Sequence, residues 1–144
     1  MAPPTTREFS AGGVVVRGRD VVVIVPHRRS QDGERVLALP KGHPDGDESL
    51  AQAATREVRE ETGLDAELVD KLGEVRYWYQ REGRRIFKQV TFFLFEYRAG
   101  DTADHDHEIE DARWIPLEEA RTALSFQGER DMVARALSRL GDDR

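Results

Sequence analysis

Residues 42–64 read GHPDGDESLAQAATREVREETGL and combine a turn, a helix and a group of acids. Gly42 opens the stretch, and turn-forming residues follow it. The spacing of apolar residues then predicts an amphipathic helix over 49–62. Either Asp47 or Ser49 suits the N-cap of this helix, and Gly63 suits a left-handed C-cap.

Glu57, Glu60 and Glu61 should lie on one side of this helix, since residues three and four apart are neighbours. Three carboxylates so close together repel one another unless a cation lies among them. Hard oxygen ligands favour Mg²⁺ or Mn²⁺, and such ions bind phosphate groups. An adjoining face of small residues should pack on a sheet, which would leave the carboxylates at the edge of a cleft. This face consists of Ala51, Ala54, Val58 and Thr62.

The rest of the chain alternates strand and helix patterns. Strands are predicted at 9–16, 21–26, 36–39 and 112–115, and helices at 116–124 and 129–140. A pattern of long strands runs from 66 to 97 and contains a hairpin of 74–80 with 85–97. Turns are expected at 18–20 and 82–83, with a polar loop at 27–34 and an acidic loop at 100–110. Strands and helices in this mixed order predict an α/β (α+β) fold, a sandwich of helices around a mixed β-sheet.

The length of 144 residues fits a single domain, which we place at 9–141 after a flexible arm at 1–8. The net charge is −6 without a basic tract, which argues against binding of nucleic-acid polymers. There is no cysteine, so disulfides and thiol nucleophiles are excluded. No apolar run reaches membrane-spanning length. We therefore expect a cytoplasmic protein that does not associate with a membrane, either as a monomer or as a homodimer.

The spacing within residues 42–64 resembles the Nudix box. That motif is Gly, five residues, Glu, seven residues, Arg-Glu, an aliphatic residue, any residue, Glu-Glu, any residue, Gly and an aliphatic residue. Here the two spacers separate Gly42, Glu48 and Arg56. The resemblance implies a Nudix hydrolase with the α/β/α fold of that family. Such enzymes use Mg²⁺ or Mn²⁺ to cleave a phosphoanhydride bond in a nucleoside diphosphate linked to another group.

The residues of the box allow roles to be assigned under this resemblance. Glu57 and Glu61, one helical turn apart, are the best pair for a metal ion, and the resemblance adds the Gly42 carbonyl as a ligand. Glu60 could bind a second metal or accept the proton of the attacking water. Arg56 should orient the cluster by ion pairing, with Glu48 as a candidate partner.

The turn before Glu48 departs from the family pattern. Many members carry a glycine directly before this glutamate, whereas here Asp47 precedes it and the glycine is Gly46. Either the turn is built differently or Asp47 adopts the left-handed conformation, which aspartate tolerates.

Further candidates lie outside the box. Lys41, in LPKGH, resembles a lysine of dinucleoside polyphosphate hydrolases and would place a charge on a substrate phosphate. Lys88 is a second candidate for phosphate, and Tyr77 and Tyr79 for stacking on a nucleobase. Glu108, in the loop before Trp114, resembles a further metal or base carboxylate, with Glu110 as its competitor. The simpler interpretation of the charged residues is a solvated loop or strand position, and that of the two tyrosines is packing in the core or on the surface.

The likeness to diadenosine polyphosphate hydrolases makes a diadenosine polyphosphate the expected substrate. The alternative is a MutT-type hydrolase that acts on nucleoside triphosphates, including oxidised ones. A different class of protein is a non-catalytic Nudix module that binds a nucleotide as a regulator. Such modules commonly lose glutamates of the box, and this chain keeps all of them.

Overall fold

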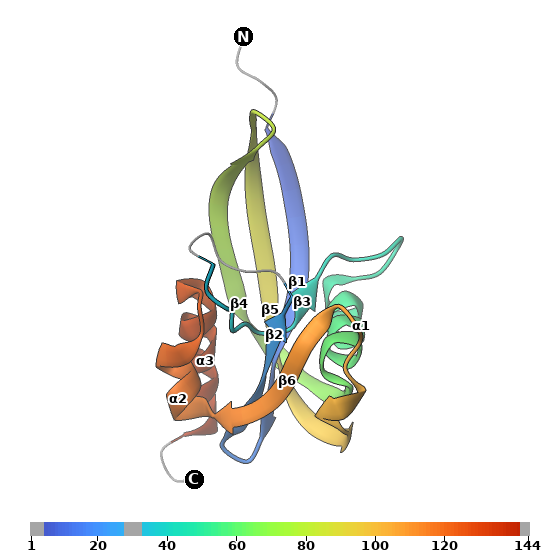
Figure 1. Cartoon of the computed structure of the whole chain (residues 1–144), viewed down its shortest axis with the longest axis vertical. Helices are drawn as coiled ribbons and strands as arrows, with labels where there is room; N and C mark the ends of the chain where they lie inside the picture. The colour runs from blue at the N-terminus through green and yellow to red at the C-terminus, as the bar shows by residue number, and fades with distance from the viewer. Residues whose placement is uncertain (1–4, 28–32, 142–144) are drawn as a thin grey trace.

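The computed structural model describes residues 5–27 and 33–141, which form one mixed sheet between helices (Figure 1). The strands are β1 (Thr6–Arg17), β2 (Asp20–Pro26), β3 (Lys41–Gly42), β4 (Leu64–Arg81), β5 (Arg84–Gly100) and β6 (Ile109–Pro116). The helices are α1 (Leu50–Thr62), α2 (Leu117–Ala123) and α3 (Gln127–Leu140), with a 3₁₀ turn η1 at Thr102–Asp104. None of these helices is long or apolar enough to cross a membrane.

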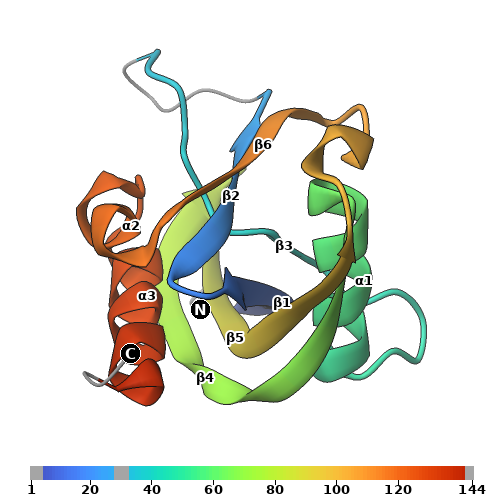
Figure 2. The ribbon, with the colours of Figure 1, turned by 90° about the horizontal axis from the view of Figure 1, so that it is seen from below.

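The sheet has the order β4-β5-β1-β2-β6, with β3 paired to β1. The strands β1 and β5 run parallel, and the other neighbours are antiparallel. Figure 2 shows α1 on one side of the sheet and α2 and α3 on the other. The predicted fold class, helices around a mixed sheet, is confirmed.

Two clusters of buried side chains join these layers. Alternate valines of β1 and β2 face opposite sides, as the period of a strand requires. Val14 and Val23 pack with α3, whereas Val15 and Val22 pack with α1. All of Val21–Val25 is buried, as expected for a strand covered on both faces. The face of α1 that packs on the sheet differs in one residue from the prediction. It consists of Ala53, Ala54, Val58 and Thr62, and Ala51 is only partly buried.

Parts of β1, β4 and β5 project beyond the helices as a three-stranded wing (Figure 1). The turn at its tip is Glu82-Gly83, as predicted, and both residues have positive φ (54° and 74°). Two left-handed residues are typical of the tight hairpin turn that matches the twist of its strands.

Some boundaries were wrong in the prediction. Residues 36–39 are not a strand, because only Ala38 bridges to the sheet, at Ile24. Thr6–Glu8, expected in the arm, pair with β5 as the start of β1. The strand β4 begins at Leu64, close to the start of the predicted strand pattern at 66, and irregular pairing interrupts its first part. Residues 1–4 of the arm and 28–32 of the polar loop lie outside the described ranges.

Candidate active site

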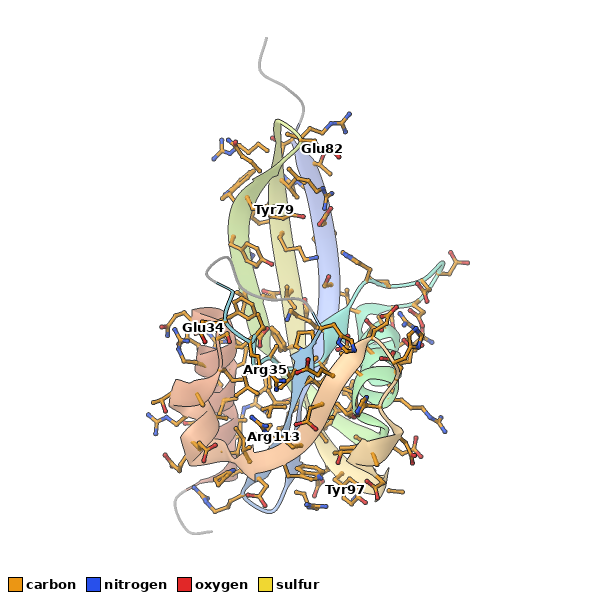
Figure 3. The ribbon with its side chains drawn as sticks, in the orientation of Figure 1. Glu34, Arg35, Tyr79, Glu82, Tyr97 and Arg113 are labelled. Atoms are coloured by element: carbon orange, nitrogen blue, oxygen red, sulfur yellow. The ribbon has the colours of Figure 1, made fainter. Side chains whose placement is uncertain are left out.

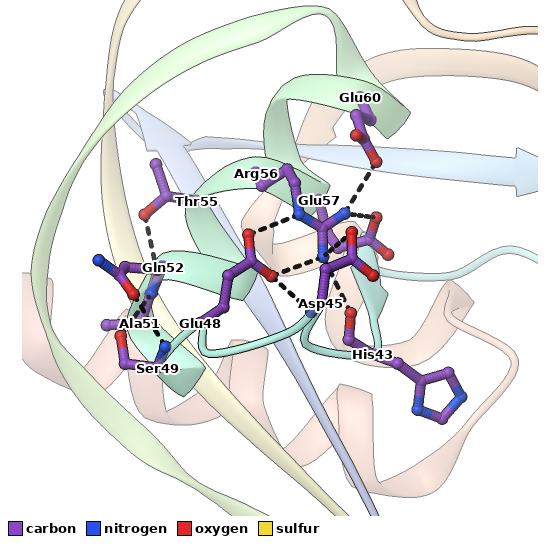
Figure 4. Close-up of polar contacts among 10 residues, drawn as sticks. All are labelled: His43, Asp45, Glu48, Ser49, Ala51, Gln52, Thr55, Arg56, Glu57 and Glu60. Carbon is purple, nitrogen blue, oxygen red and sulfur yellow. Dashed lines mark hydrogen bonds and ion pairs between the residues drawn. The ribbon is translucent and has the colours of Figure 1, made fainter.

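The helix α1 is fixed at both ends by its own sequence. Ser49 is the N-cap, and its side chain accepts a hydrogen bond from the Gln52 amide while the Gln52 side chain accepts one from the Ser49 amide (Figure 4). Gly63 is the C-cap with φ of 78°, as predicted. These caps satisfy amide and carbonyl groups that the helix leaves unpaired.

The turn before α1 is built around Gly46 and not around Asp47. Gly46 has the positive φ (51°), and Asp47 does not. The Asp45 amide donates to Glu48 Oε1 at 2.8 Å, and the Glu48 amide donates to the Asp45 carbonyl at 3.0 Å. The glycine one position earlier therefore serves the turn, and Glu48 still reaches its place beside α1.

Arg56 lies at the centre of the acidic groups (Figure 4). Its guanidinium donates two hydrogen bonds to Glu48, at 2.8 and 2.9 Å, which confirms the predicted pair. Its Nη1 donates to both Glu57 Oε1 and Glu60 Oε1 at 3.0 Å. The Arg56 bonds lower the pKa of Glu48 to about 2, and the same pairing raises the pKa of Arg56. Arg56 is thus a fixed cation that hydrogen-bonds three carboxylates and also pairs with Asp45 at 3.5 Å.

Glu57 and Glu61 are held in surroundings that oppose their charge. Burial raises the pKa of Glu57 to about 8, with further contributions from a hydrogen bond to Glu60 and the charge of Glu61. Burial raises the pKa of Glu61 to about 7, although the Lys41 amide donates to its Oε1 at 2.9 Å and lowers it in part. A bound cation would favour the ionised form of both groups.

Gly42 lies directly against Glu57. A Cβ atom at position 42 would overlap the Glu57 carboxylate, so any other residue here would displace that side chain. The backbone of β3 and the carboxylates of α1 thereby come close together, as the predicted ligand set of Gly42, Glu57 and Glu61 requires. Among residues 5–27 and 33–141, no three His, Asp or Glu side chains are grouped so that they could hold one ion as they lie. Hydrogen bonds direct Glu57 and Glu60 to Arg56, and Glu61 to Lys41. The oxygen donors and their raised pKa values nevertheless suit a hard divalent cation.

The acidic loop approaches the C-terminal end of α1. The Asp106 amide donates to the Glu60 carbonyl at 2.9 Å, and the Glu108 amide donates to Asp106 Oδ1 at 3.1 Å. The charges of Asp106 and Glu108 both add to the rise in the pKa of Glu61. Glu110, the competitor, forms an ion pair with Arg35 at 2.7 Å. The loop therefore brings Glu108 towards the cluster, together with Asp106, which the sequence did not single out.

A cavity of about 270 Å³ brings several predicted residues together. Its lining includes Lys41, Gly42, Glu61, Tyr77 and Lys88. Burial lowers the pKa of Lys88, and the nearby charge of Lys41 adds to this effect although Glu8 opposes it. Two cationic side chains and a partly buried acid thus border one cavity beside α1.

Tyr77 and Tyr79 share one face of the wing, with ring centres 6.2 Å apart. Trp78 lies on the other face against Phe87, as alternation along a strand predicts. Tyr77 lines the cavity beside Lys88, whereas the Tyr79 hydroxyl donates to Glu8 Oε1 at 2.6 Å. Figure 3 shows Tyr79 on the projecting part of β4. Of the two tyrosines, Tyr77 is the nearer to the acidic cluster.

Lys41 has a partner that the sequence did not indicate. Its Nζ is 2.7 Å from Glu129 Oε2 on α3, and it lies 5.3 Å from the centre of the Phe126 ring. Phe126 and Glu129 line a second cavity of about 490 Å³, which shares Lys41 and Tyr77 with the first. One signal was available: Glu129 falls on the apolar face of α3, three residues before Met132. An acid on a buried face needs a specific partner.

A model of the NUDIX domain matches residues 6–136. The chain belongs to the NUDIX family. Among its relatives, the "Putative mutator protein MutT4" of Mycobacterium tuberculosis is 36% identical over 134 residues, covering 90% of this chain and 54% of the relative. An "8-oxo-(d)GTP phosphatase" of Mycolicibacterium smegmatis is 31% identical over 128 residues, covering 89% and 37%. The chain therefore spans about half, or less, of the length of these two NUDIX relatives.

Solved structures of other NUDIX proteins show the same fold. A NUDIX hydrolase from Nitrosomonas europaea has a TM-score of 0.74 at 20% identity, with 91% of this chain and 88% of that one covered. An Ap4A hydrolase from C. elegans has a TM-score of 0.67 at 19% identity, with 92% and 97% covered.

Proposed function

We propose that this NUDIX domain hydrolyses a phosphoanhydride bond of a nucleotide in the presence of Mg²⁺ or Mn²⁺. The observation that supports this most directly is the cavity beside α1, where the cationic Lys41 and Lys88 face the acidic Glu61. Phosphate oxygens need positive charge near them, and phosphoryl transfer needs a site that neutralises these oxygens.

Within this proposal, the Gly42 carbonyl, Glu57 and Glu61 hold a divalent cation. When bound, the cation supplies charge that stabilises the phosphate oxygens and acidifies a water molecule. Glu108 adds a further carboxylate from the acidic loop. Arg56 is a positioning residue, because it orients Glu57 and Glu60 through direct hydrogen bonds. Glu60, whose side chain is 47% exposed, is the candidate acceptor for the proton of the attacking water.

The cavity of about 490 Å³ offers a place for the nucleoside. It is lined by the aromatic rings of Tyr77 and Phe126 and adjoins the phosphate side at Lys41. Aromatic side chains stack on a nucleobase and contribute roughly 1–3 kcal/mol per base. A nucleotide would place its base here and its phosphates towards α1.

Two classes of substrate follow from different observations. The relative whose name states a substrate, an 8-oxo-(d)GTP phosphatase, favours nucleoside triphosphates, including those with oxidised guanine. The wing favours a longer substrate such as a diadenosine polyphosphate, because Lys88 and Tyr77 extend the polar lining along β4 and β5 away from α1. We place oxidised and ordinary triphosphates first, and diadenosine polyphosphates second.

A substrate panel with product identification tests this proposal. Oxidised and ordinary nucleoside triphosphates and diadenosine polyphosphates should each be incubated with Mg²⁺ or Mn²⁺. The variants E57Q and E61Q should lower turnover of the preferred substrate on the order of 100-fold. The matched control is E119Q, an exposed acid on α2, which should leave turnover unchanged. If the wild type binds nucleotides but hydrolyses none, the regulator interpretation holds and the proposed hydrolase activity is wrong.

A further inference from the structure

Residues 37–41, which lead into β3, form an extended segment. One edge of this segment forms hydrogen bonds with side chains, where a sheet would have a neighbouring strand. Amides of alternate residues in an extended chain point the same way. Here the backbone amides of three alternate residues each donate a hydrogen bond to a side-chain oxygen, at similar distances. The bonds run from Leu37 to Ser125 Oγ at 2.8 Å, from Leu39 to Glu129 Oε1 at 2.8 Å, and from Lys41 to Glu61 Oε1 at 2.9 Å.

The opposite edge of the same segment joins the sheet. Ala38 exchanges two backbone hydrogen bonds with Ile24, at 2.8 and 2.9 Å, and the Gly13 amide donates to the Pro40 carbonyl at 3.1 Å. The segment is therefore held between the sheet on one side and, on the other, side chains from the junction of α2 and α3 and from α1. Its position fixes the Lys41 amide, which bonds the carboxylate of Glu61.

Glu129 is the charged member of this edge. It is 4% exposed, and a carboxylate so buried is costly to retain unless its oxygens are paired. One oxygen accepts from the Leu39 amide, and the other pairs with Lys41 Nζ at 2.7 Å. Glu129 also lies in the first turn of α3, where the helix dipole favours a negative charge. Both of its bonds thus go to the segment that leads into Gly42.

We propose that Glu129 is a positioning residue that fixes Lys41 and Gly42 relative to Glu61. It acts through the Leu39 amide and the Lys41 ammonium, from a helix on the far side of the sheet from α1. The effect on turnover rests on the proposed hydrolase function. The effect on the segment itself does not, because it concerns hydrogen bonds that exist without a ligand.

The central variant is E129Q, which keeps an acceptor for the Leu39 amide but removes the charge that holds Lys41. Hydrogen exchange measured by NMR should become roughly tenfold faster at Leu39 and Lys41, because the charged bond anchors both residues. The affinity for Mn²⁺, measured by electron paramagnetic resonance, should fall roughly tenfold, as expected when a residue that supports metal ligands is changed. D131N, an exposed acid on the same helix, is the matched control and should change neither quantity.

Kinetics provide a separate test in the active protein. The kcat of E129Q should fall roughly tenfold with a smaller change in KM, because misplaced groups penalise the transition state more than binding. In a K41M background, the further loss from E129Q should shrink, since the two residues act as a pair. Equal losses from E129Q with and without K41M would contradict action through Lys41.

E129D gives a second route if E129Q does not fold. It keeps the charge but shortens the side chain by one methylene, so its exchange rates and Mn²⁺ affinity should lie between those of the wild type and E129Q. Unchanged exchange at Leu39 and Lys41 together with unchanged Mn²⁺ affinity, in whichever variant folds, would overturn the proposal. A wild type without hydrolase activity would refute the proposed function, whereas these two measurements would still decide the role of Glu129.

Discussion

Glu57 and Glu61 combine burial with close contact to other acids. Burial raises the pKa of Glu57 to about 8 and that of Glu61 to about 7, so both groups bind protons in the neutral range when no cation is bound. Metal binding needs the ionised form, so protons compete with the cation. The same two residues therefore couple metal affinity, folding stability and pH.

This coupling predicts a pH-dependent effect of Mn²⁺ on stability. The ordinary pKa of these carboxyls is 4.5, so the raised values penalise the folded state as pH rises from about 5 to 8. Mn²⁺ removes the penalty by pairing with the ionised groups. The increase in Tm caused by Mn²⁺ should thus be larger at pH 8 than at pH 5.5, as measured by thermal unfolding. Equal increases at both pH values would contradict the assignment.

The contact between Gly42 and Glu57 allows a steric test of the proposed metal ligands. G42A would drive a methyl group into the Glu57 carboxylate, so Glu57 must leave its place beside β3. We expect Mn²⁺ affinity to fall at least tenfold, on the order seen when groups around a metal are disturbed. Calorimetric titration measures this affinity, and an unchanged value would show that Glu57 is not a ligand at this position.

At the scale of elements, α1 and the wing are each stabilised by local hydrogen bonds. The capping box of Ser49 and Gln52 fixes where α1 begins, and hence where Glu57 and Glu61 lie one turn apart. On the wing, Glu8 joins β1 to β4 by accepting from the Tyr79 hydroxyl and pairing with Arg81. Each arrangement can be removed by one substitution.

S49A should lower the free energy of unfolding by about 1 kcal/mol, because the Gln52 amide loses its acceptor. Urea unfolding measures the change. T55A provides a control within α1, since Thr55 only donates to the Ala51 carbonyl inside the helix. A loss in T55A as large as that in S49A would argue against a specific role of the cap.

Glu8 predicts a loss of stability in acid. The bonds from Tyr79 and Arg81 lower its pKa to about 2 from an ordinary value of 4.5. Its contribution is complete above pH 5 and disappears as pH falls towards 2. Because Arg81 is more than half exposed, we expect less than about 1 kcal/mol. E8Q should remove this part of the pH dependence in urea unfolding, and an unchanged profile would contradict it.

Most elements, and the placement of the candidate site residues around α1, could be predicted from the sequence because local patterns specify them. The caps of α1 and the pairing of Arg56 with Glu48 depend on residues close in the chain. The segment 36–39 was misread because its apolar pattern suits a strand, whereas its outer edge bonds to side chains. Glu129 was missed for a related reason: its partner Lys41 is 88 residues away, and helical spacing shows a buried face but not what lies across from it.

At the scale of the whole molecule, three layers meet at β1, which contributes side chains to the buried clusters on both faces of the sheet. Phe95 of β5 is fully buried in the cluster beneath α1, where it lies against Gly13. The sheet order and the parallel pairing of β1 with β5 are global properties that the pattern of single segments does not contain.

F95A should lower the free energy of unfolding by roughly 3–5 kcal/mol, because it leaves a cavity between α1 and the sheet. Chemical denaturation measures the loss. Trp78, whose side chain is about half exposed on the wing, gives a contrast: W78A removes more atoms yet should cost less. A larger loss in W78A than in F95A would contradict the described core.

The parallel pairing of β1 with β5 also has a consequence for synthesis and folding. Val14 pairs with Leu94, so β1 cannot pair with β5 until some eighty further residues have been synthesised. During translation, β1 can form its hairpin with β2, while its other edge has no neighbour until β5 has emerged from the ribosome. Contacts of such long range slow folding. An exposed apolar edge in the nascent chain is a site where chaperones bind and where aggregation begins.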